Sequence, residues 1–314
     1  MIKLSVVTPT HNPRPELLSR VLDALKRQTL SLDQWEYVLV DNASKVPLKG
    51  VYNLSWHPNG HIVDEPQLGL TPARLRGLDL SKGSIIVFVD DDCVLPPNYL
   101  EKAITMMNDY PHIGVWGAYI EGEFLAPIED WMKPFAIMLC AMQFSPDRKV
   151  DVQYALARQP GPWIPAGAGM VMRKNVTDAY ELSVRNDPYR LSLDRTGTNL
   201  IGSGDADIVA TAIDMGLAVG NTMRLRVTHL IPESRLQLKY MLRLLYSSNY
   251  GTAKFSIHRG FREQKNPPRE TMLTRLRKYI GSFVPKTPEQ QCHIAFGKGY
   301  QDGICGLPFD DKYR

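Results

Sequence analysis

The sequence has few cysteines, and no two of them lie close together. The four are Cys93, Cys140, Cys292 and Cys305, and none forms a C-x-x-C pair. This spacing excludes the usual zinc-binding motifs and a disulfide framework, and it is typical of proteins from a reducing compartment. We therefore expect a cytoplasmic protein without disulfide bonds.

Long hydrophobic runs are also lacking. The longest apolar block, residues 135–142, is far shorter than the ~20 residues that span a bilayer. The amino-terminal run of β-branched residues stops at Pro9, too early for a signal peptide, and it predicts a first strand instead. An integral membrane protein is therefore not expected, although a peripheral position on the inner face of a membrane is compatible with the sequence.

The residues that are present give an ordinary globular composition with an uneven distribution of charge. The chain of 314 residues is 44% hydrophobic and 22% charged, which excludes wholesale disorder and fibrous architectures. Its 37 basic and 33 acidic residues nearly balance, but residues 221–286 contain 14 Lys or Arg and only 3 Glu. A basic C-terminal part joined to an acidic remainder indicates an anionic partner for the C-terminal part.

The first half of the chain alternates between strand and helix patterns. Apolar, β-branched runs predict strands at residues 3–8, 37–40, 61–63 and 85–89. Amphipathic segments predict helices at residues 15–29 and 71–80. The run at 85–89 is apolar at every position, as in a strand covered by helices on both faces. This order predicts an α/β fold with an open, mostly parallel sheet flanked by helices.

The second half is less regular. Strands are expected at residues 114–121, 170–173 and 223–229, a helix at 206–215, a helix or buried loop at 131–142, and an irregular loop at 160–169. After Pro232 the pattern is helical and basic through residue 246, and again over 269–280. We therefore divide the chain into an α/β domain over residues 1–230 and a helical, basic C-terminal extension over residues 231–314.

Three of the expected strands end in polar residues, at Thr8–Thr10, Asp41–Asn42 and Asp90–Asp92. In open α/β sheets the functional groups lie just beyond such carboxyl ends. If the chain is extended here, Asp90 and Asp92 point the same way and present hard oxygen ligands to one divalent cation. The alternative is a solvated turn in which one aspartate caps the next helix. Three acids after five apolar residues favour the metal site.

Several short segments, taken in order, resemble the signatures of family 2 glycosyltransferases. They are Ser5–Asn12, Val40–Ser44, Gly69–Arg74, Val89–Asp92 and Gly204–Ile208, and the resemblance covers about residues 1–230. It implies a GT-A fold with a Rossmann-like nucleotide-binding half. It also implies a metal-dependent, inverting transfer of a sugar from a nucleoside diphosphate, with a UDP-sugar favoured, to a hydroxyl of a glycan or lipid-linked acceptor.

The same resemblance implies a set of donor-binding residues. They are Thr8, Pro9, His11, Asp41, Asn42, Arg74, Asp90, Asp91, Gly167 and Ala168. The first three would line the base, and Asp41 would contact the base or the ribose. Asn42 stands where many relatives have a second acid, and its amide oxygen can still accept a base N–H. Arg74 would reach the base or the diphosphate, the alternative being an exposed helix arginine.

The remaining donor contacts involve backbone and ribose. Asp90 would approach the ribose. The run around Gly167 and Ala168 has no side chain that could obstruct a ligand, which suggests close approach of the backbone to the donor sugar; the alternative is tight strand packing.

Metal and catalytic residues follow from the resemblance as well. Asp92, with Asp90, would hold Mn²⁺ or Mg²⁺ against the diphosphate, and His229 would complete the site unless it is simply a core or surface histidine. Asp205 resembles the catalytic base, the alternative being a helix cap. Gly204 stands where relatives have Glu, so acceptor-side hydrogen bonding is expected to be altered.

Two residues are candidates for the acceptor side. Asp207 would be a structural or an acceptor contact, and Trp163 would stack on a sugar unless it belongs to the core or a lid.

Three other functions are alternatives to a glycosyltransferase. Asp90–Val94 also satisfies the D-x-D-x-V motif of haloacid-dehalogenase-type phosphatases, but that motif normally opens the chain. A nucleotidyltransferase would need a glycine-rich basic loop near the amino terminus, and a sugar-binding module would not need both the metal acids and Asp205. A glycosyltransferase is therefore favoured.

The C-terminal extension offers a possible partner surface. Leu236, Tyr240 and Leu244 recur at helical spacing beside a basic stripe of Arg235, Lys239 and Arg243. That pattern is typical of a helix lying on an anionic membrane, and the alternative is an apolar stripe packed on the rest of the protein with solvated charges. A nucleic-acid partner is not expected.

Overall fold

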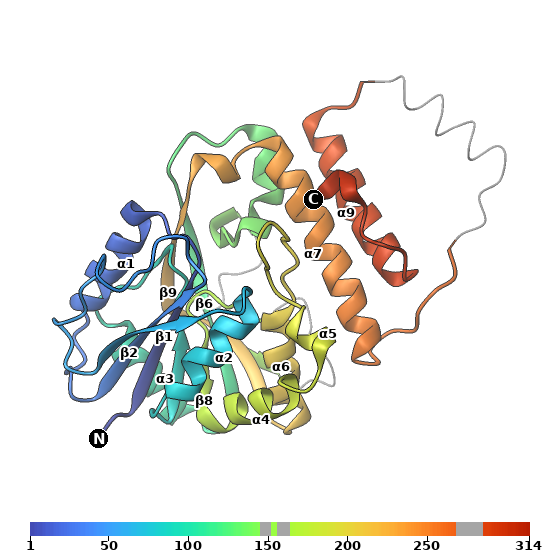
Figure 1. The fold of residues 1–314 in the computed structure, drawn as a ribbon. Coiled ribbons are helices and arrows are strands. Elements are labelled where there is room, and N and C mark those ends of the chain that lie inside the picture. Colours follow the sequence, from blue (N-terminus) through green and yellow to red (C-terminus); the bar gives the residue numbers. More distant parts are fainter. Residues whose placement is uncertain (145–151, 156–163, 268–284) are drawn as a thin grey trace.

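The computed structural model describes residues 1–144, 152–155, 164–267 and 285–314 (Figure 1). Within these ranges nine strands form one sheet with the order β3-β2-β1-β4-β8-β6-β9-β5, and β7 pairs with β9. The strands are β1 (Leu4–Thr10), β2 (Trp35–Asn42), β3 (Gly60–Glu65), β4 (Ile85–Phe88), β5 (Cys93–Val94), β6 (Ile113–Phe124), β7 (Val152–Ala155), β8 (Val171–Arg173) and β9 (Ala218–Ile231).

The helices cover both faces of the sheet (Figure 1). They are α1 (Pro15–Lys26), α2 (Leu70–Leu80), α3 (Tyr99–Asp109), α4 (Lys174–Val184), α5 (Pro188–Leu191), α6 (Gly204–Asp214), α7 (Leu238–His258) and α9 (Pro288–Ile304). Short 3₁₀ helices are η1 (Asp130–Leu139), η2 (Met142–Phe144), η3 (Glu233–Arg235) and η4 (Asp311–Tyr313). The expected α/β architecture is confirmed.

The sheet is parallel in its first half and mixed in its second. Strands β3, β2, β1 and β4 are parallel neighbours, as the sequence predicts. Beyond them β8 runs antiparallel to both β4 and β6, while β6 and β9 are parallel. The sheet is therefore fully parallel in the half that the sequence analysis expects to bind the nucleotide. The parallel order brings the carboxyl ends of β1, β2 and β4 to the same edge of the sheet.

Alternation along the buried strands divides the core into two layers. In β1, Val6 packs into a cluster with helices α1 and α3, whereas Val7 packs into a second cluster with α2, α4 and α6. Successive side chains of a strand point to opposite faces, so an uninterrupted apolar run serves both layers. This explains why the run at residues 85–89, which forms the next strand of the same sheet, is apolar at every position.

The C-terminal helices α7 and α9 lie side by side and extend the core at one end of the sheet (Figure 1). A third apolar cluster joins them to η1, through Phe135 and Leu139 on one side and Leu245 and Ala295 on the other. Helix α7 has 21 residues, yet no helix in the described part of the chain has the length and apolarity to cross a bilayer. The boundary expected at residue 230 falls one residue before the end of β9.

Glycines set the distance between α7 and α9. A Cβ atom at Gly299 would overlap the carbonyl oxygen of Tyr246, and one at Gly303 would lie 2.7 Å from the carbonyl oxygen of Tyr250. The two glycines are four residues apart and therefore lie on one face of α9. By contrast, a Cβ at Gly297 would meet nothing within 4 Å.

We expect opposite stability changes from two substitutions in this helix. Gly299→Ala should lower the free energy of unfolding by about 1–3 kcal/mol, because the two helix backbones must move apart. Gly297→Ala should raise it by about 0.5–1 kcal/mol, because alanine favours the helix and meets open space. Urea unfolding followed by circular dichroism measures both. Equal effects of the two substitutions would show that the helices are not held at backbone contact.

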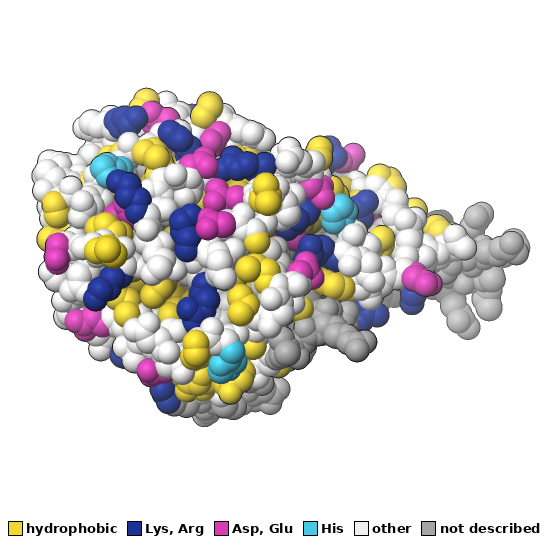
Figure 2. All heavy atoms as spheres, turned by 90° about the horizontal axis from the view of Figure 1, so that it is seen from below, with side chains coloured by type: hydrophobic (Ala, Val, Ile, Leu, Met, Phe, Trp, Pro, Cys, Tyr) yellow, Lys and Arg dark blue, Asp and Glu magenta, His cyan; other side chains and the backbone are white. Residues whose placement is uncertain are grey.

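The surface at the base of Figure 1 mixes charges of both signs (Figure 2). Ion pairs join Lys174 to Asp178 within α4, which lies at this base, and Arg185 to Asp79, both with N–O distances of 2.5 Å. On this face the basic side chains are interspersed with acids.

Candidate active site

A cavity of about 480 Å³ opens at the carboxyl ends of β1, β2 and β4. Volumes in this range are typical of ligand sites. Its wall includes five aspartates and three arginines, so acids exceed basic residues by two before any histidine is counted. These residues are Asp90, Asp91, Asp92, Asp194, Asp205, Arg74, Arg195 and Arg235. The cavity therefore combines an attraction for cations with arginines that suit anionic groups.

The three acids after β4 form a turn. The backbone N–H of Cys93 donates to the carbonyl oxygen of Asp90 at 3.0 Å, so the chain is not extended here, as the metal-site prediction assumed. All three side chains still line the cavity. Asp91 accepts a hydrogen bond from the hydroxyl of Thr10. Burial and the neighbouring Asp92 raise the pKa of Asp91 to about 7, against the effect of that hydrogen bond.

Asp92 lies at the centre of a compact polar cluster. Its Oδ2 is 2.8 Å from the guanidinium of Arg235 and 3.5 Å from Nε2 of His229. The pairing of β5 with β9 places Cys93 directly opposite His229, which fixes the approach of the two segments. Burial alone would raise the pKa of Asp92, but the charge of the Arg235 guanidinium outweighs it and holds the pKa far below the usual range. Asp92 is therefore an anion in the folded protein.

The tautomer of His229 follows from its hydrogen bonds. Nδ1 lies 2.9 Å from the carbonyl oxygen of Leu139, which can only accept, so Nδ1 carries the proton of the neutral ring. Nε2 then presents its lone pair toward Arg235, whose N–H donates to it at 2.9 Å. A histidine ligand whose other nitrogen donates to a backbone carbonyl is the usual arrangement at metal sites.

These donors fit a hard divalent cation. In the described part of the chain, one group of three possible ligands lies within 4.8 Å of one another, and it consists of Asp92, Cys93 and His229. Burial and the adjacent acids raise the pKa of the Cys93 thiol well above its usual value, so it stays protonated and is a poor ligand. The carboxylate of Asp92 and the imidazole of His229 remain, whereas Asp90 lines the cavity outside this group.

Across the cavity, Asp205 is held by Arg74 and by a backbone N–H. It lies in the first turn of α6, where Oδ2 accepts from the N–H of Gly167 at 2.7 Å and Oδ1 is 2.7 Å from Arg74. The side chain of Asp205 is 32% exposed, so it remains accessible from the cavity. Arg74 is 1% exposed, which rules out the exposed-arginine alternative. A Cβ at Gly167 would overlap the Arg74 guanidinium and lie 2.5 Å from Asp205.

Asp194 completes this arrangement and was not among the residues singled out from the sequence. Its carboxylate is 2.9 Å from Arg74 and accepts from the hydroxyl of Thr71 at 3.2 Å and the N–H of Gly204 at 3.1 Å. A Cβ at Gly204 would overlap the Asp194 carboxylate. The space above Gly204 is therefore filled by an acid from another segment. The signal in the sequence was the lack of a side chain at Gly204, where the family pattern has a glutamate.

The residues expected to surround the base are only partly in the cavity wall. Pro9, His11 and Asn42 line it, whereas Thr8 is buried inside β1 and Asp41 is absent from the lining. These positions correct the expectation that Thr8 and Asp41 face the ligand.

Asp41 and Asn42 shape the neighbouring loops instead. The carboxylate of Asp41 accepts from the N–H groups of Ser44 and Leu48. The amide of Asn42 donates to the carbonyls of Glu65 and Gln67, and its oxygen accepts from the N–H of Gly69 at 2.8 Å. The amide oxygen expected to receive a base N–H thus already has a backbone donor.

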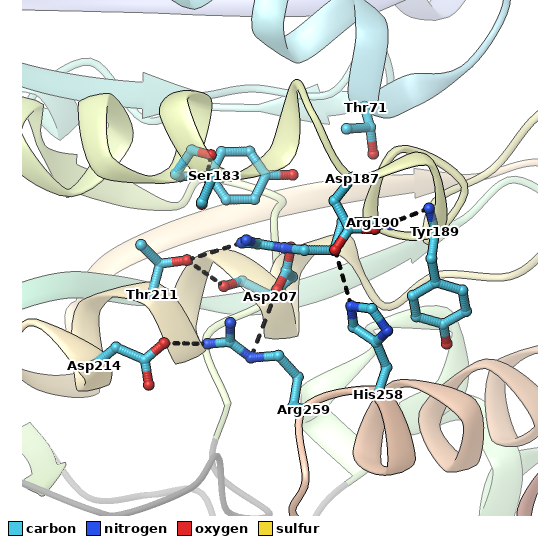
Figure 3. A network of polar contacts seen from close by, with 12 residues as sticks. Thr71, Ser183, Asp187, Tyr189, Arg190, Asp207, Thr211, Asp214, His258 and Arg259 are labelled. Carbon is cyan, nitrogen blue, oxygen red and sulfur yellow. Dashed lines mark hydrogen bonds and ion pairs between the residues drawn. The ribbon is translucent and has the colours of Figure 1, made fainter.

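Asp207 does not line the cavity and belongs instead to a polar network with Arg190 and Arg259 (Figure 3). Its carboxylate is fully buried, 2.7 Å from Arg190 and 3.9 Å from Arg259, and Arg259 also pairs with Asp214 at 2.5 Å. Of the two roles considered, the structural one applies, and the acceptor contact assigned to Asp207 is corrected. Trp163, the other acceptor candidate, lies outside the described residues. Gly167 and Ala168 line the cavity.

The amino-terminal part of α7 belongs to the site. Tyr240 and Leu244 line the cavity, and Leu236 is buried. Arg235 contacts Asp92, and Arg243 donates to the carbonyl of Thr198 at 2.6 Å. Within the basic stripe, Lys239 is exposed, whereas Arg235 and Arg243 are half-buried. The expectation that this helix presents a free amphipathic face to a membrane is therefore corrected, because its apolar stripe packs on the rest of the protein. The second basic segment, 269–280, lies outside the described residues.

Comparison with known sequences adds an independent finding. The model of a family described as Glycosyl transferase family 2 matches residues 5–164. The chain is 29% identical over 187 residues to a dolichol-phosphate mannosyltransferase of Pyrococcus furiosus, covering 58% of this chain and 49% of that protein. It is 27% identical over 108 residues to glycosyltransferase AglE of Haloferax volcanii, covering 33% and 35%. The matches thus span half or less of these relatives.

Solved structures share the fold at low sequence identity. The crystal structure of S. aureus TarS has a TM-score of 0.51 and 14% identity, over 97% of this chain and 55% of that one. The crystal structure of GalNAc-T7 with UDP, GalNAc and Mn²⁺ has a TM-score of 0.51 and 17% identity, over 90% and 55%. Both are GT-A-type glycosyltransferases, so the expected fold is confirmed.

Proposed function

The chain belongs to glycosyl transferase family 2 and is a glycosyltransferase; on that premise we propose that it transfers a sugar from a nucleoside diphosphate donor, with inversion, at the cavity described above. The observation that carries this proposal is the placement of two different acidic groups around one cavity. Asp92 pairs with His229 on one wall, and Asp205 pairs with Arg74 on the other. Asp92 and His229 could hold a cation against the departing diphosphate, and Asp205 could take the proton of the acceptor hydroxyl.

Asp92 and His229 would hold the divalent cation, Mn²⁺ or Mg²⁺, with Asp90 close by. When bound, such a cation neutralises the negative charge that develops on the departing nucleoside diphosphate. The excess of acids in the cavity wall supports this assignment, because adjacent carboxylates are costly to bury without a counter-ion. The GalNAc-T7 structure, which contains UDP and Mn²⁺, supports a UDP-sugar as the favoured donor.

Asp205 would act as the general base. An inverting transfer needs one carboxylate to take the proton of the acceptor hydroxyl while its oxygen attacks the anomeric carbon. The guanidinium of Arg74 lies 2.7 Å from Oδ1 of this carboxylate, and the N–H of Gly167 donates to Oδ2 at 2.7 Å, so the two contacts fix its orientation. Asp194 in turn holds Arg74 in place. Arg74 would therefore be a positioning residue, since its guanidinium pairs with Asp194 and Asp205.

The acceptor would lie between Asp205 and α7. Leu200, Tyr240 and Leu244 give this side of the cavity an apolar wall, and Arg195, an exposed residue, also lines the cavity. An apolar wall beside a cation suits a sugar face or a lipid-linked phosphate. The relative named dolichol-phosphate mannosyltransferase supports a lipid-linked acceptor. We keep residues 1–230 as the catalytic domain and 231–314 as an extension that completes its acceptor wall.

The direct test is product analysis with the whole chain. We expect incubation with UDP-sugars to release UDP in the presence of Mn²⁺ and far less in EDTA, and GDP-sugars serve as the competing donor class. A phosphate ester should yield no orthophosphate. The family match gives the phosphatase alternative no support, and orthophosphate release without nucleotide release would contradict the proposal.

Gly167→Ala tests the position of the base. The added methyl group meets Arg74 and Asp205, so we expect turnover to fall by about tenfold or more while donor binding changes little, because orientation errors of about 1 Å carry costs of this order. The matched control is Gly202→Ala, which lines the same cavity but whose Cβ would meet only one atom, at 4.0 Å. A similar loss in both variants would show that cavity space, and not the position of Asp205, is being measured.

A further inference from the structure

Arg235 contacts both residues that would hold the cation. Its guanidinium is 2.8 Å from Oδ2 of Asp92 and donates to Nε2 of His229 at 2.9 Å. It is the last residue of η3, directly after β9, and its side chain is 22% exposed. The basic stripe that the sequence suggested for a membrane thus begins inside the active site.

The contact with His229 cannot coexist with a metal bond to the same nitrogen. The proton on Nδ1 is directed to the carbonyl of Leu139, so Nε2 has a single lone pair in the ring plane. That lone pair accepts an N–H from Arg235 or binds a cation, but not both. Asp92 is less restrictive, because a carboxylate has two oxygens, yet at 5% exposure it has little room for two cations.

A displaced guanidinium would remain in the cavity, which Arg235 lines together with Asp90, Asp91 and Arg195. Arginine has a flexible stem and a planar fork of N–H donors that matches the oxygens of a phosphate. Among the groups of a nucleoside diphosphate sugar, the diphosphate is the anionic one. The bound donor therefore offers the displaced guanidinium a bidentate anionic partner that is absent when the cation binds alone.

We propose that Arg235 and the divalent cation compete for His229 and Asp92, and that the guanidinium displaced by the cation binds the diphosphate of the donor, so that cation and donor bind cooperatively. This inference rests on the proposed function. A cation that binds alone breaks the two contacts of Arg235, and no diphosphate replaces them. When the donor binds with the cation, contacts between Arg235 and the diphosphate replace the two that are lost. Coupling of this kind is reciprocal, so the cation strengthens donor binding by the same factor.

Calorimetric titration of the full chain with Mn²⁺, alone and with UDP or GDP present, measures this coupling. In Arg235→Gln we expect Mn²⁺ alone to bind about tenfold tighter than in the native protein, because a charge-assisted contact is of that magnitude. The nucleotide should then strengthen Mn²⁺ binding much less than it does in the native protein. Arg235→Lys keeps the charge without the fork and should lie between the two. Lys239→Gln, an exposed cation one helical turn further on, should match the native protein.

The outcomes separate the inference from the proposed function. If Asp92→Asn abolishes Mn²⁺ binding but both Arg235 variants, with native thermal unfolding, bind Mn²⁺ alone no tighter than the native protein, competition by Arg235 is wrong and the metal site stands. If neither Asp92→Asn nor His229→Ala changes Mn²⁺ binding, the metal site itself is wrong, and the inference fails with it. Tighter binding in Arg235→Gln with unchanged nucleotide coupling would support the competition and reject the diphosphate contact.

Discussion

Asp92→Asn is expected to lower turnover by about 10²–10³-fold or more and to remove the dependence of nucleotide binding on Mn²⁺. The amide keeps the size of the side chain but loses the charge that attracts the cation. Stabilisation of a departing diphosphate by a bound cation amounts to several kcal/mol, and each ~1.4 kcal/mol changes the rate tenfold. Calorimetry with UDP, with and without EDTA, and a nucleotide-release assay measure the two effects.

A matched control separates this effect from general loss of charge. Asp109 is an exposed acid at the end of α3, and Asp109→Asn should leave both measurements within about twofold of the native protein, as surface changes usually do. If the native protein binds UDP with equal affinity in Mn²⁺ and in EDTA, the assignment of the cation to Asp92 and His229 is wrong.

The second large effect is expected at Asp205. Asp205→Asn removes the proton acceptor while an amide oxygen can still accept from Gly167, so donor binding should persist and transfer should fall by about 10²–10⁴-fold. Single-turnover transfer and equilibrium binding of UDP distinguish the two quantities.

Asp214→Asn is the control for this substitution, because Asp214 closes the same helix and its side chain is 58% exposed. It should leave transfer nearly unchanged. Transfer retained within a few-fold in Asp205→Asn would remove the base from this residue. Asp207 would not inherit the role, since its carboxylate is buried beside Arg190.

Much of the fold could be predicted because local patterns determine it. The β-branched run at residues 3–8 and the apolar run at 85–89 are strands, as expected, and Pro15 and Gly216 lie at the start and just beyond the end of the expected helices. Helix α9 was not predicted. Its glycines lower helix propensity in isolation, and Gly299 and Gly303 are favourable only because the backbones of Tyr246 and Tyr250 in α7 lie against them.

The site was harder to predict, because its contacts join distant segments. The sequence indicates that Asp92 and Asp205 are important, but it cannot show that Asp194 supports Arg74 across 120 residues. Helical spacing identified the stripe from Leu236 to Leu244 without showing what covers it. The assumption of an extended chain at Asp90–Asp92 failed because the turn depends on one backbone hydrogen bond, which periodicity does not reveal.

Helix α7 has a consequence for how such an enzyme can change its acceptor. Tyr240, Leu244 and Ser248 line the cavity at intervals of four residues, so a single stripe of one helix would form part of the proposed acceptor wall. The far end of the same helix is fixed by His258 and the adjacent Arg259, which pair with Asp187 and Asp214. Substitutions along the stripe can therefore reshape the acceptor pocket while the helix keeps its place and the residues facing the donor stay unaltered. In the proposed arrangement, the stripe of α7 that would face the acceptor is a different segment from the strand ends that would bind the donor, so substitutions in one need not alter the other.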